Sequence, residues 1–317
     1  MFSLFKRNMP APDASSFTTL RKYSAIASSA TSGTLKGIPT GGYVAGGFSG
    51  GRLLQNFIPS LKKEKIEHYL QKNIFVNLQY TGTNHPSYLT RDTFNNIYLS
   101  FILNDIHKYS PSGSLISSVA FLTSDSGSRF SFVIEPITGN YYLPNWRDGT
   151  LTVRNPSGVI QAEFPLERGL SYYVAIGTNG KLYVTDTVYS QINISDISTT
   201  INTPIDVGQL FPAFIVLDSD NTIYFSSTTE IYKLSTTNIP ILIYDTLFAI
   251  GGLCIDNNRN LFVLDTTNSR IIKNNIQIIA SNLQSPAGLT IDSNSNLYTT
   301  EVDIHNDHYI IITKFTY

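Results

Sequence analysis

One phrase recurs along the chain, and this repeat constrains the fold more than any other feature of the sequence. Its clearest copy, 251–273, holds three short apolar runs separated by two polar turns. In each copy the second run begins with an apolar residue that is followed by an aromatic one. These aromatic residues stand at positions 98, 142, 183, 224, 262 and 298. The spacings are 44, 41, 41, 38 and 36 residues. A period near forty residues is typical of an array of four-stranded sheets.

The repeat predicts an all-β fold, a six-bladed β-propeller. Four strands of about 5 to 6 residues with their turns fill one period, and a radial array of such sheets is a propeller. The last copy supplies only three strands, at 288–292, 296–301 and 309–317, which would leave an open sheet edge. The apolar stretch 72–80 has no hairpin mate, so we expect it to be the outer strand of the sixth blade and to close the ring.

Three segments are expected. Residues 1–59 are rich in Gly, Ser and Thr, which predicts an extended or disordered arm. Residues 60–71 predict a short helix that Ser60 caps, and 72–317 form the propeller. The sequence leaves open whether the arm is an idle terminus or orders on a partner through apolar residues such as Tyr43 and Phe48.

The composition excludes several classes of function. The net charge is -1 and charged residues make up 14% of the chain, so no field of one sign favours nucleic acid or an anionic membrane. Cys254 is the single cysteine, and its place in an apolar run predicts a buried, inert thiol. No apolar run fits a signal peptide or a membrane-spanning helix. We therefore expect a soluble chain without a signal peptide or transmembrane segment, intracellular or particle-associated.

The last two copies resemble NHL-type repeats. The family phrase Pro-x-Gly-aliphatic-x-aliphatic-Asp is matched by Pro286, Gly288, Leu289, Ile291 and Asp292. The phrase Leu-Tyr-Val-x-Asp followed by Asn-x-Arg-Ile is matched by Leu261, Phe262, Val263, Asp265, Asn268, Arg270 and Ile271. The resemblance implies a propeller of one of three kinds: a binding platform, a lactonase with a divalent ion on the axis, or a streptogramin-lyase-type enzyme that uses histidine. A shared fold alone does not choose among them.

The loops that join second to third strands are expected to gather on one face around the channel mouth. The predicted binding face consists of Asn104, Asp105, Trp146, Arg147, Asp148, Asp186, Tyr189, Asp265, Asn268, Glu301 and Asp303. Trp146 beside Arg147 is the kind of pair that anchors a protein partner. The alternative is that Trp146 only covers a divergent blade.

Four residues are candidates for catalysis: Glu301, His305, His308 and Glu135. Imidazole and carboxylate groups together can hold a metal or transfer protons, but the loop that carries the histidines also fits a solvated loop. Glu135 is the one odd acid among the mostly apolar residues near the first turn of each copy. The recurring Asp92, Asp218, Asp256 and Asp292 precede those turns and are expected to bond backbone N–H groups there.

These observations favour a non-catalytic binding or structural module, whose face takes a protein partner and whose arm docks on a larger assembly such as a viral or cellular particle. The alternative is a propeller enzyme of the lyase or lactonase type with a divalent metal or histidine-based site at the channel mouth. The sequence leaves the enzyme question open and favours a protein that is not an enzyme. It predicts no cofactor and assigns no metal ligand, and a divalent metal belongs only to the enzyme alternative.

Overall fold

The computed structural model describes residues 71–79, 86–101, 105–120, 131–145, 149–166, 171–197, 202–245, 247, 249–274, 277–302 and 309–316. The predicted arm, 1–59, lies outside these residues. So does the predicted helix, except for Gln71, which is the first residue of strand β1 (Gln71–Gln79). The chain divides into two units, Met1–Glu67 and His68–Tyr317, and every described residue belongs to the second.

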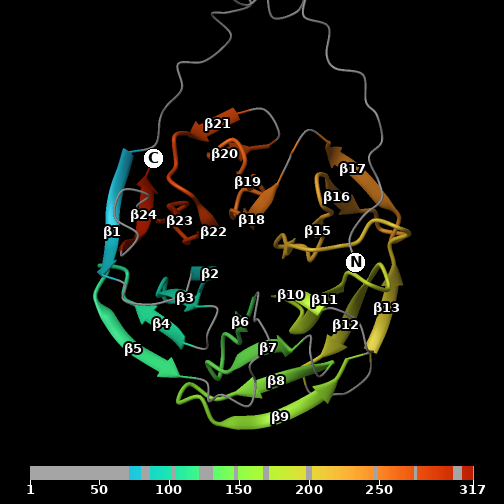
Figure 1. Ribbon diagram of the computed structural model, residues 1–317. Helices are drawn as coiled ribbons and strands as arrows, with labels where there is room; N and C mark the ends of the chain where they lie inside the picture. Colours follow the sequence, from blue (N-terminus) through green and yellow to red (C-terminus); the bar gives the residue numbers. More distant parts are fainter. Residues whose placement is uncertain are drawn as a thin grey trace, which may run out of the picture. The chain divides into compact units, whose positions relative to one another are not determined.

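The described residues form six four-stranded antiparallel sheets, arranged as blades around an axis (Figure 1). Blade one contains β2 (Pro86–Arg91), β3 (Ile97–Phe101), β4 (Asp105–Tyr109) and β5 (Leu115–Ala120). Blade two contains β6 (Val133–Ile134), β7 (Tyr141–Asn145), β8 (Thr150–Arg154) and β9 (Ile160–Pro165). Blade three contains β10 (Ser171–Ile176), β11 (Lys181–Asp186), β12 (Gln191–Asp196) and β13 (Asn202–Asp206).

The other three blades follow the same order from the centre outward. Blade four contains β14 (Ile215–Leu217), β15 (Ile223–Ser226), β16 (Ile231–Leu234) and β17 (Pro240–Tyr244). Blade five contains β18 (Ile250–Ile255), β19 (Leu261–Asp265), β20 (Arg270–Lys273) and β21 (Gln277–Ala280). Blade six contains β22 (Ala287–Ile291), β23 (Leu297–Val302), β24 (Tyr309–Thr316) and, outermost, β1.

The ring closes as the sequence predicts. Strand β1 pairs antiparallel with β24, from Gln71 opposite Thr316 to Gln79 opposite Tyr309, and Figure 1 shows β1 alongside the C-terminal strand. The predicted six-bladed propeller, with an N-terminal strand that completes the last blade, is therefore confirmed. Blade two, whose copy of the repeat is the most divergent, is also a complete four-stranded sheet.

The core lies between blades rather than within them. Six clusters of buried apolar residues each combine side chains of two adjacent blades. At the closing interface, Val76 of β1 and Ile312 of β24 belong to one cluster with Leu89, Ile97 and Leu99 of blade one. Because each blade buries its faces only against its neighbours, the stability of the ring depends on closure.

The four recurring aspartates bond the first hairpin turns, as predicted. In each copy one carboxylate oxygen accepts the backbone N–H groups two and four residues on, at 2.8 to 3.0 Å. The other oxygen accepts a tyrosine hydroxyl of the second strand in three copies: from Tyr98 on Asp92 and from Tyr298 on Asp292 at 3.0 Å each, and from Tyr224 on Asp218 at 3.5 Å. These aspartates are therefore structural.

An ion pair between an exposed lysine and a buried carboxylate ties the closing strand to blade six. The side chain of Glu301 is only 3% exposed, and its carboxylate lies 2.8 Å from the ammonium group of Lys72 on β1. The same carboxylate accepts the N–H of Gln284 at 2.7 Å and the hydroxyl of Thr313 at 2.6 Å. Glu301 therefore connects β1, β24 and the segment that enters blade six.

Replacing Lys72 with methionine should destabilise the ring by about 2 kcal/mol, because it leaves the buried Glu301 carboxylate without its cation. The expected loss is moderate because Lys72 is itself 46% exposed and solvent weakens the pair. Urea unfolding measures the change. The double variant Lys72→Met, Glu301→Gln is the control, and it should recover part of the loss because no buried charge remains. A single variant as stable as the parent would show that the pair does not hold β1.

No helix within the described ranges has the length and apolar character that a membrane span requires.

Candidate functional site

The blades present two distinct faces. The loops between second and third strands lie at the same end as the segments that lead to the next blade: Val207 N–H donates to Ser190 C=O at 3.0 Å, and Leu283 N–H to Ser269 C=O at 3.1 Å. We call this end of the ring the loop face. The opposite end carries the first hairpin turns, and we call it the turn face.

Blade three carries the most apolar described part of the loop face. Asp186 ends β11, is fully buried, and accepts the N–H groups of Val188 and Tyr189 at 3.0 Å each. The loop then returns into β12 through Ser190, whose φ of 53° lies in the left-handed region. This geometry leaves Val188 52% and Tyr189 54% exposed.

A second segment adds an aromatic ring beside this loop. Phe211, in the connection from β13 to β14, is 51% exposed and has a φ of 49°. The Thr187 hydroxyl donates to the carbonyl of Pro212 at 2.7 Å and ties the two segments together. Val188, Tyr189 and Phe211 therefore belong to two adjoining segments of the loop face, and we call them the blade-three patch.

Two other residues of the predicted binding face, Asp265 and Asn268, are hydrogen-bonded to each other. Asp265 ends β19, is fully buried, and accepts both the backbone N–H of Asn268 at 3.1 Å and its side-chain amide at 2.8 Å. The guanidinium of Arg270 lies 2.9 Å from the same carboxylate. Asp265 and Asn268 thus hold their loop in shape, as Asp186 does in blade three, while Asp105 is the partly buried first residue of β4.

Several predicted site residues lie outside the described residues. They are Asn104, Trp146, Arg147, Asp148, Asp303, His305 and His308. Their proposed roles in binding or catalysis remain predictions. Within the ranges that the structure describes, no group of three or more His, Cys, Asp or Glu side chains is placed to hold a metal ion.

Glu135 has the same local role as the turn aspartates. Its carboxylate accepts the N–H of Ile137 at 3.2 Å, the N–H of Thr138 at 2.8 Å and the Thr138 hydroxyl. Burial acts to raise the pKa of Glu135, but these hydrogen bonds outweigh it and hold the pKa below its usual value. Glu135 lies on the turn face and Glu301 at the loop-face end of β23, so the fold does not bring the two candidates together.

Four aromatic side chains, on or next to the inner strands of blades one to four, contact one another toward the centre of the ring. The ring centroids of Tyr88 and Tyr173 are 6.0 Å apart, and those of Tyr173 and Phe214 are 4.0 Å apart. Blades one and three are not neighbours, so the contact of Tyr88 with Tyr173 spans the middle. Phe132 of blade two joins them, 5.9 Å from Tyr88. We call these four residues the aromatic plug.

The thiol of Cys254 belongs to the inner strand of blade five and is buried, as predicted. Burial raises its pKa, and the nearby Asp256 carboxylate adds to the effect. Burial likewise raises the pKa of Tyr88, with a smaller contribution from Cys254. Both groups therefore stay protonated near neutral pH, which fits packing rather than nucleophilic chemistry.

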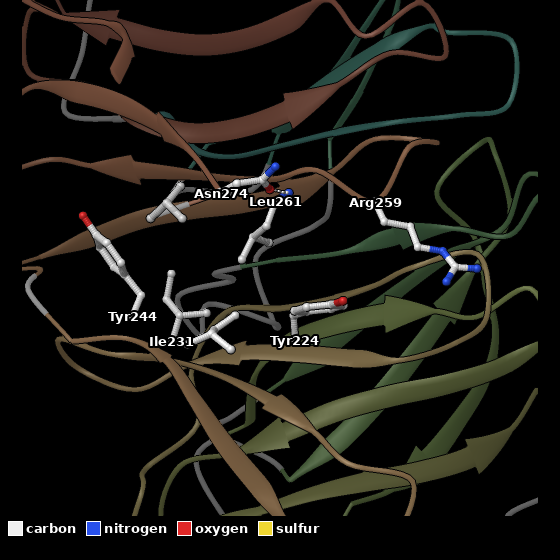
Figure 2. A pocket seen from close by; sticks show the side chains of 8 residues that line it. Tyr224, Ile231, Tyr244, Arg259, Leu261 and Asn274 are labelled. Atoms are coloured by element: carbon white, nitrogen blue, oxygen red, sulfur yellow. Dashed lines mark hydrogen bonds between the residues drawn. The ribbon is translucent and has the colours of Figure 1, made fainter. Parts of the chain in front are cut away.

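A pocket of about 320 Å³ lies between blades four and five (Figure 2). Ile231 and Tyr244 line it from blade four, and Leu261 and Val263 from blade five. Its polar rim includes Arg259, whose guanidinium is paired with Asp220 of blade four. A wider pocket of about 490 Å³ occupies the equivalent place between blades three and four.

On the loop face, sequence reasoning selected mainly polar and charged residues, together with Trp146 and Tyr189. Val188 and Phe211 were not among them, and neither were the four residues of the aromatic plug. A usable signal exists for the first pair: both stand in short connecting segments, where apolar side chains have no core to enter. Large apolar residues in connections deserve the same weight as charged ones.

No known family model and no curated protein matches the chain. Several solved structures do match the chain. Virginiamycin B lyase from Staphylococcus aureus superposes with a TM-score of 0.56 at 15% identity, over 78% of this chain and 89% of that one. A streptogramin B lyase gives 0.57 at 16% identity, over 80% and 89%. A protein of unknown function from Bacteroides thetaiotaomicron gives 0.60 at 12% identity, over 77% and 75%. At these identities the likeness shows the fold, that of streptogramin B lyase-type propellers.

Proposed function

We propose that the ring is a non-catalytic binding module and that a protein partner docks on the blade-three patch of its loop face. The observation that carries this proposal is the exposure of three large apolar side chains on two segments that a hydrogen bond holds together. Tyr189 and Phe211 supply the large ring surfaces on which binding energy concentrates at protein interfaces.

The patch is also held in a fixed shape before any partner arrives. Asp186 fixes the loop through two N–H groups, and Thr187 fixes the connection through the Pro212 carbonyl. A partner that docks there orders little further backbone, so less of the contact energy is lost to conformational entropy. Trp146 and Arg147 belong to the corresponding loop of the neighbouring blade and are proposed to extend the same surface.

Site-specific photo-crosslinking tests the proposal. A benzophenone amino acid replaces Tyr189 or Phe211 in the full chain, and the matched control carries it at Phe94, which is 77% exposed on the turn face. We expect the two loop-face sites to capture the same protein from native cell extract and the control site to leave it uncaptured. Unlabelled parent protein should compete, whereas a Tyr189→Glu, Phe211→Glu competitor should not. Equal capture from all three sites would contradict the proposal.

We also propose that the arm, 1–59, tethers the ring to a larger assembly. Its Gly-rich stretch with apolar residues suits docking along another surface. Deleting 1–59 should leave the crosslinking pattern of the ring unchanged and abolish co-sedimentation with that assembly. Co-sedimentation that persists without the arm would refute the tether.

The competing function is a propeller enzyme of the lyase or lactonase type. The superposition on streptogramin B lyases favours it, and one solved structure holds a catalytically inactive virginiamycin B lyase with quinupristin. If the ring is a binding module, incubation with quinupristin should leave the compound unchanged by mass spectrometry and chromatography. Conversion by the parent chain that is lost in a His305→Ala, His308→Ala variant would establish the enzyme instead.

A further inference from the structure

The pocket of about 320 Å³ between blades four and five plays no part in the proposed binding face. Strands β15, β16, β17 and β19 supply most of its lining. Arg259 and Asn274 are exposed, so the mouth of the pocket lies beside these two residues. Figure 2 shows Arg259 on one side of the labelled side chains and Tyr244 on the other. Five lining residues are at most 9% exposed: Tyr224, Ile231, Tyr244, Leu261 and Val263.

A short turn leaves this interface between blades less covered than others. The turn between third and fourth strands packs against the neighbouring blade: in blade one, a Cβ on Gly113 would stand only 2.5 Å from the carbonyl oxygen of Phe75 on β1. In blades one, two and four this turn has five residues, 110–114, 155–159 and 235–239. In blade five Lys273 lies opposite Gln277, which leaves only three, 274–276. Less chain is therefore available there to cover the interface with blade four.

A β-bulge brings two consecutive side chains of β17 to the pocket. Side chains alternate between the two faces of a regular strand, yet both Ile243 and Tyr244 line the pocket. The register accounts for this: Ile231 lies opposite Tyr244 and Tyr232 lies opposite Leu242, so Ile243 is the extra residue of a bulge. Because these walls belong to paired strands, the shape of the pocket is fixed before a ligand binds.

The lining of the pocket selects an uncharged ligand. The guanidinium of Arg259 is already paired with Asp220, and none of the other described lining residues carries a charge. The side chain of Asn274 is also engaged, since it accepts the N–H of Leu261 and donates to the side chain of Asn260. A charged ligand would lose its hydration on entering without gaining a partner, which is costly.

Tyr244 offers the pocket one hydrogen-bonding group. Its side chain is only 7% exposed, and among the described residues its hydroxyl has no hydrogen-bond partner. The hydroxyl of Tyr224, by contrast, donates to Asp218. A polar group shielded from water costs free energy unless it is hydrogen-bonded, and a water molecule in a site with apolar walls finds few further partners. A ligand with a single acceptor atom therefore fits this end of the pocket.

We propose that this pocket binds a small neutral aromatic molecule of two fused rings, which accepts a hydrogen bond from the Tyr244 hydroxyl. A dry apolar cavity of about 150 Å³ takes one benzene ring, and this pocket has about twice that volume. The rings of Tyr224 and Tyr244 favour an aromatic ligand, since aromatic pairs gain energy beyond the area they bury. The wider pocket between blades three and four does not suit such a ligand, because polar side chains line much of it: Thr203, Asp206, Asn221, Thr237 and Asn238.

Isothermal titration with two probes, 2-naphthol and naphthalene, tests the hydrogen bond. The full chain is injected into each probe, and only 2-naphthol carries the acceptor oxygen. We expect one 2-naphthol per chain with a dissociation constant on the order of tens of micromolar, and about 5-fold weaker binding of naphthalene. The variant Tyr244→Phe keeps the ring and removes the hydroxyl. It should therefore weaken 2-naphthol binding about 5-fold and leave naphthalene binding unchanged.

A second pair of variants tests the place of binding. Val263→Phe puts an additional ring into the pocket and should weaken the binding of both probes at least about 10-fold. The matched control, Ile194→Phe, fills the wider pocket between blades three and four and should bind both probes like the parent. Circular dichroism and thermal unfolding check that the variants fold. If Val263→Phe does not fold, the comparison of Tyr244→Phe with the parent still decides.

Several results would overturn the proposal. They are no binding of 2-naphthol up to about 500 μM, equal affinity of Tyr244→Phe and the parent for 2-naphthol, and equal losses in Val263→Phe and Ile194→Phe. Binding that is lost in a Tyr189→Glu, Phe211→Glu variant would place the probe on the blade-three patch and also reject the pocket.

Discussion

Removing β1 should abolish the folded ring, whereas removing only the residues before it should leave the ring intact. Strand β1 completes the sheet of blade six, brings Val76 into the cluster shared with blade one, and supplies the cation for Glu301. Without β1, β24 becomes an open edge and the interface between the last and first blades loses part of its core. An open edge of this kind leads to aggregation.

Two truncated chains, 71–317 and 80–317, allow the comparison by size-exclusion chromatography and thermal unfolding. The first keeps every pairing described between β1 and β24, and we expect a soluble monomer at low concentration with one cooperative transition. The second should aggregate or unfold without a cooperative transition. A monomeric 80–317 chain with the melting temperature of 71–317 would show that β1 is not needed for closure.

Replacing Gly252 with alanine should cost more than about 3 kcal/mol, because the added methyl group overpacks a close approach between two blades. Gly252 lies on the inner strand β18, and a Cβ there would stand 2.9 Å from both the backbone nitrogen and the Cβ of Leu289 on β22. The nitrogen belongs to the neighbouring main chain and cannot rotate away. The two blades would have to separate at the centre of the ring.

Gly180→Ala is the matched control in a denaturant titration. Gly180 has a φ of +72°, and no atom lies within 4 Å of the position of its Cβ, so alanine there tests backbone strain without crowding. We expect a loss of about 1 kcal/mol at Gly180, clearly less than at Gly252. A Gly252→Ala variant as stable as the control would show that the inner strands have room to move apart.

The sequence was sufficient to predict the features that repeat. Each copy carries its own aromatic, and all but the third, which has Gly177 there, carry their own turn acid. Six blades and the role of residues such as Asp92 therefore follow from the local pattern. The closing strand can also be predicted, because the last copy supplies only three of the four strands that a blade needs. Strand β13 carries no local signal of its own, since its sequence, NTPID, is mostly polar and holds a proline, and such residues are depleted in strands.

Features that depend on contacts between residues far apart in sequence could not be predicted from the local pattern. The partners Lys72 and Glu301 are 229 residues apart in sequence, and nothing local distinguishes Glu301 from a residue of a solvated loop. Asp265 looks like a surface acid, yet it is buried because its own turn supplies its hydrogen-bond donors. Likewise, the contact of Tyr88 with Tyr173 requires two blades that are adjacent neither in sequence nor in space.

The affinity of the captured partner for altered loop faces tests the binding role most directly. Isothermal titration compares the parent ring with a Tyr189→Ala, Phe211→Ala variant and with a Phe94→Ala control on the turn face. We predict that the loop-face variant binds at least about 30-fold more weakly, the loss expected when anchoring aromatic residues are truncated, and that the control binds like the parent. An affinity that is the same for all three proteins would contradict the assignment of the loop face as the binding surface.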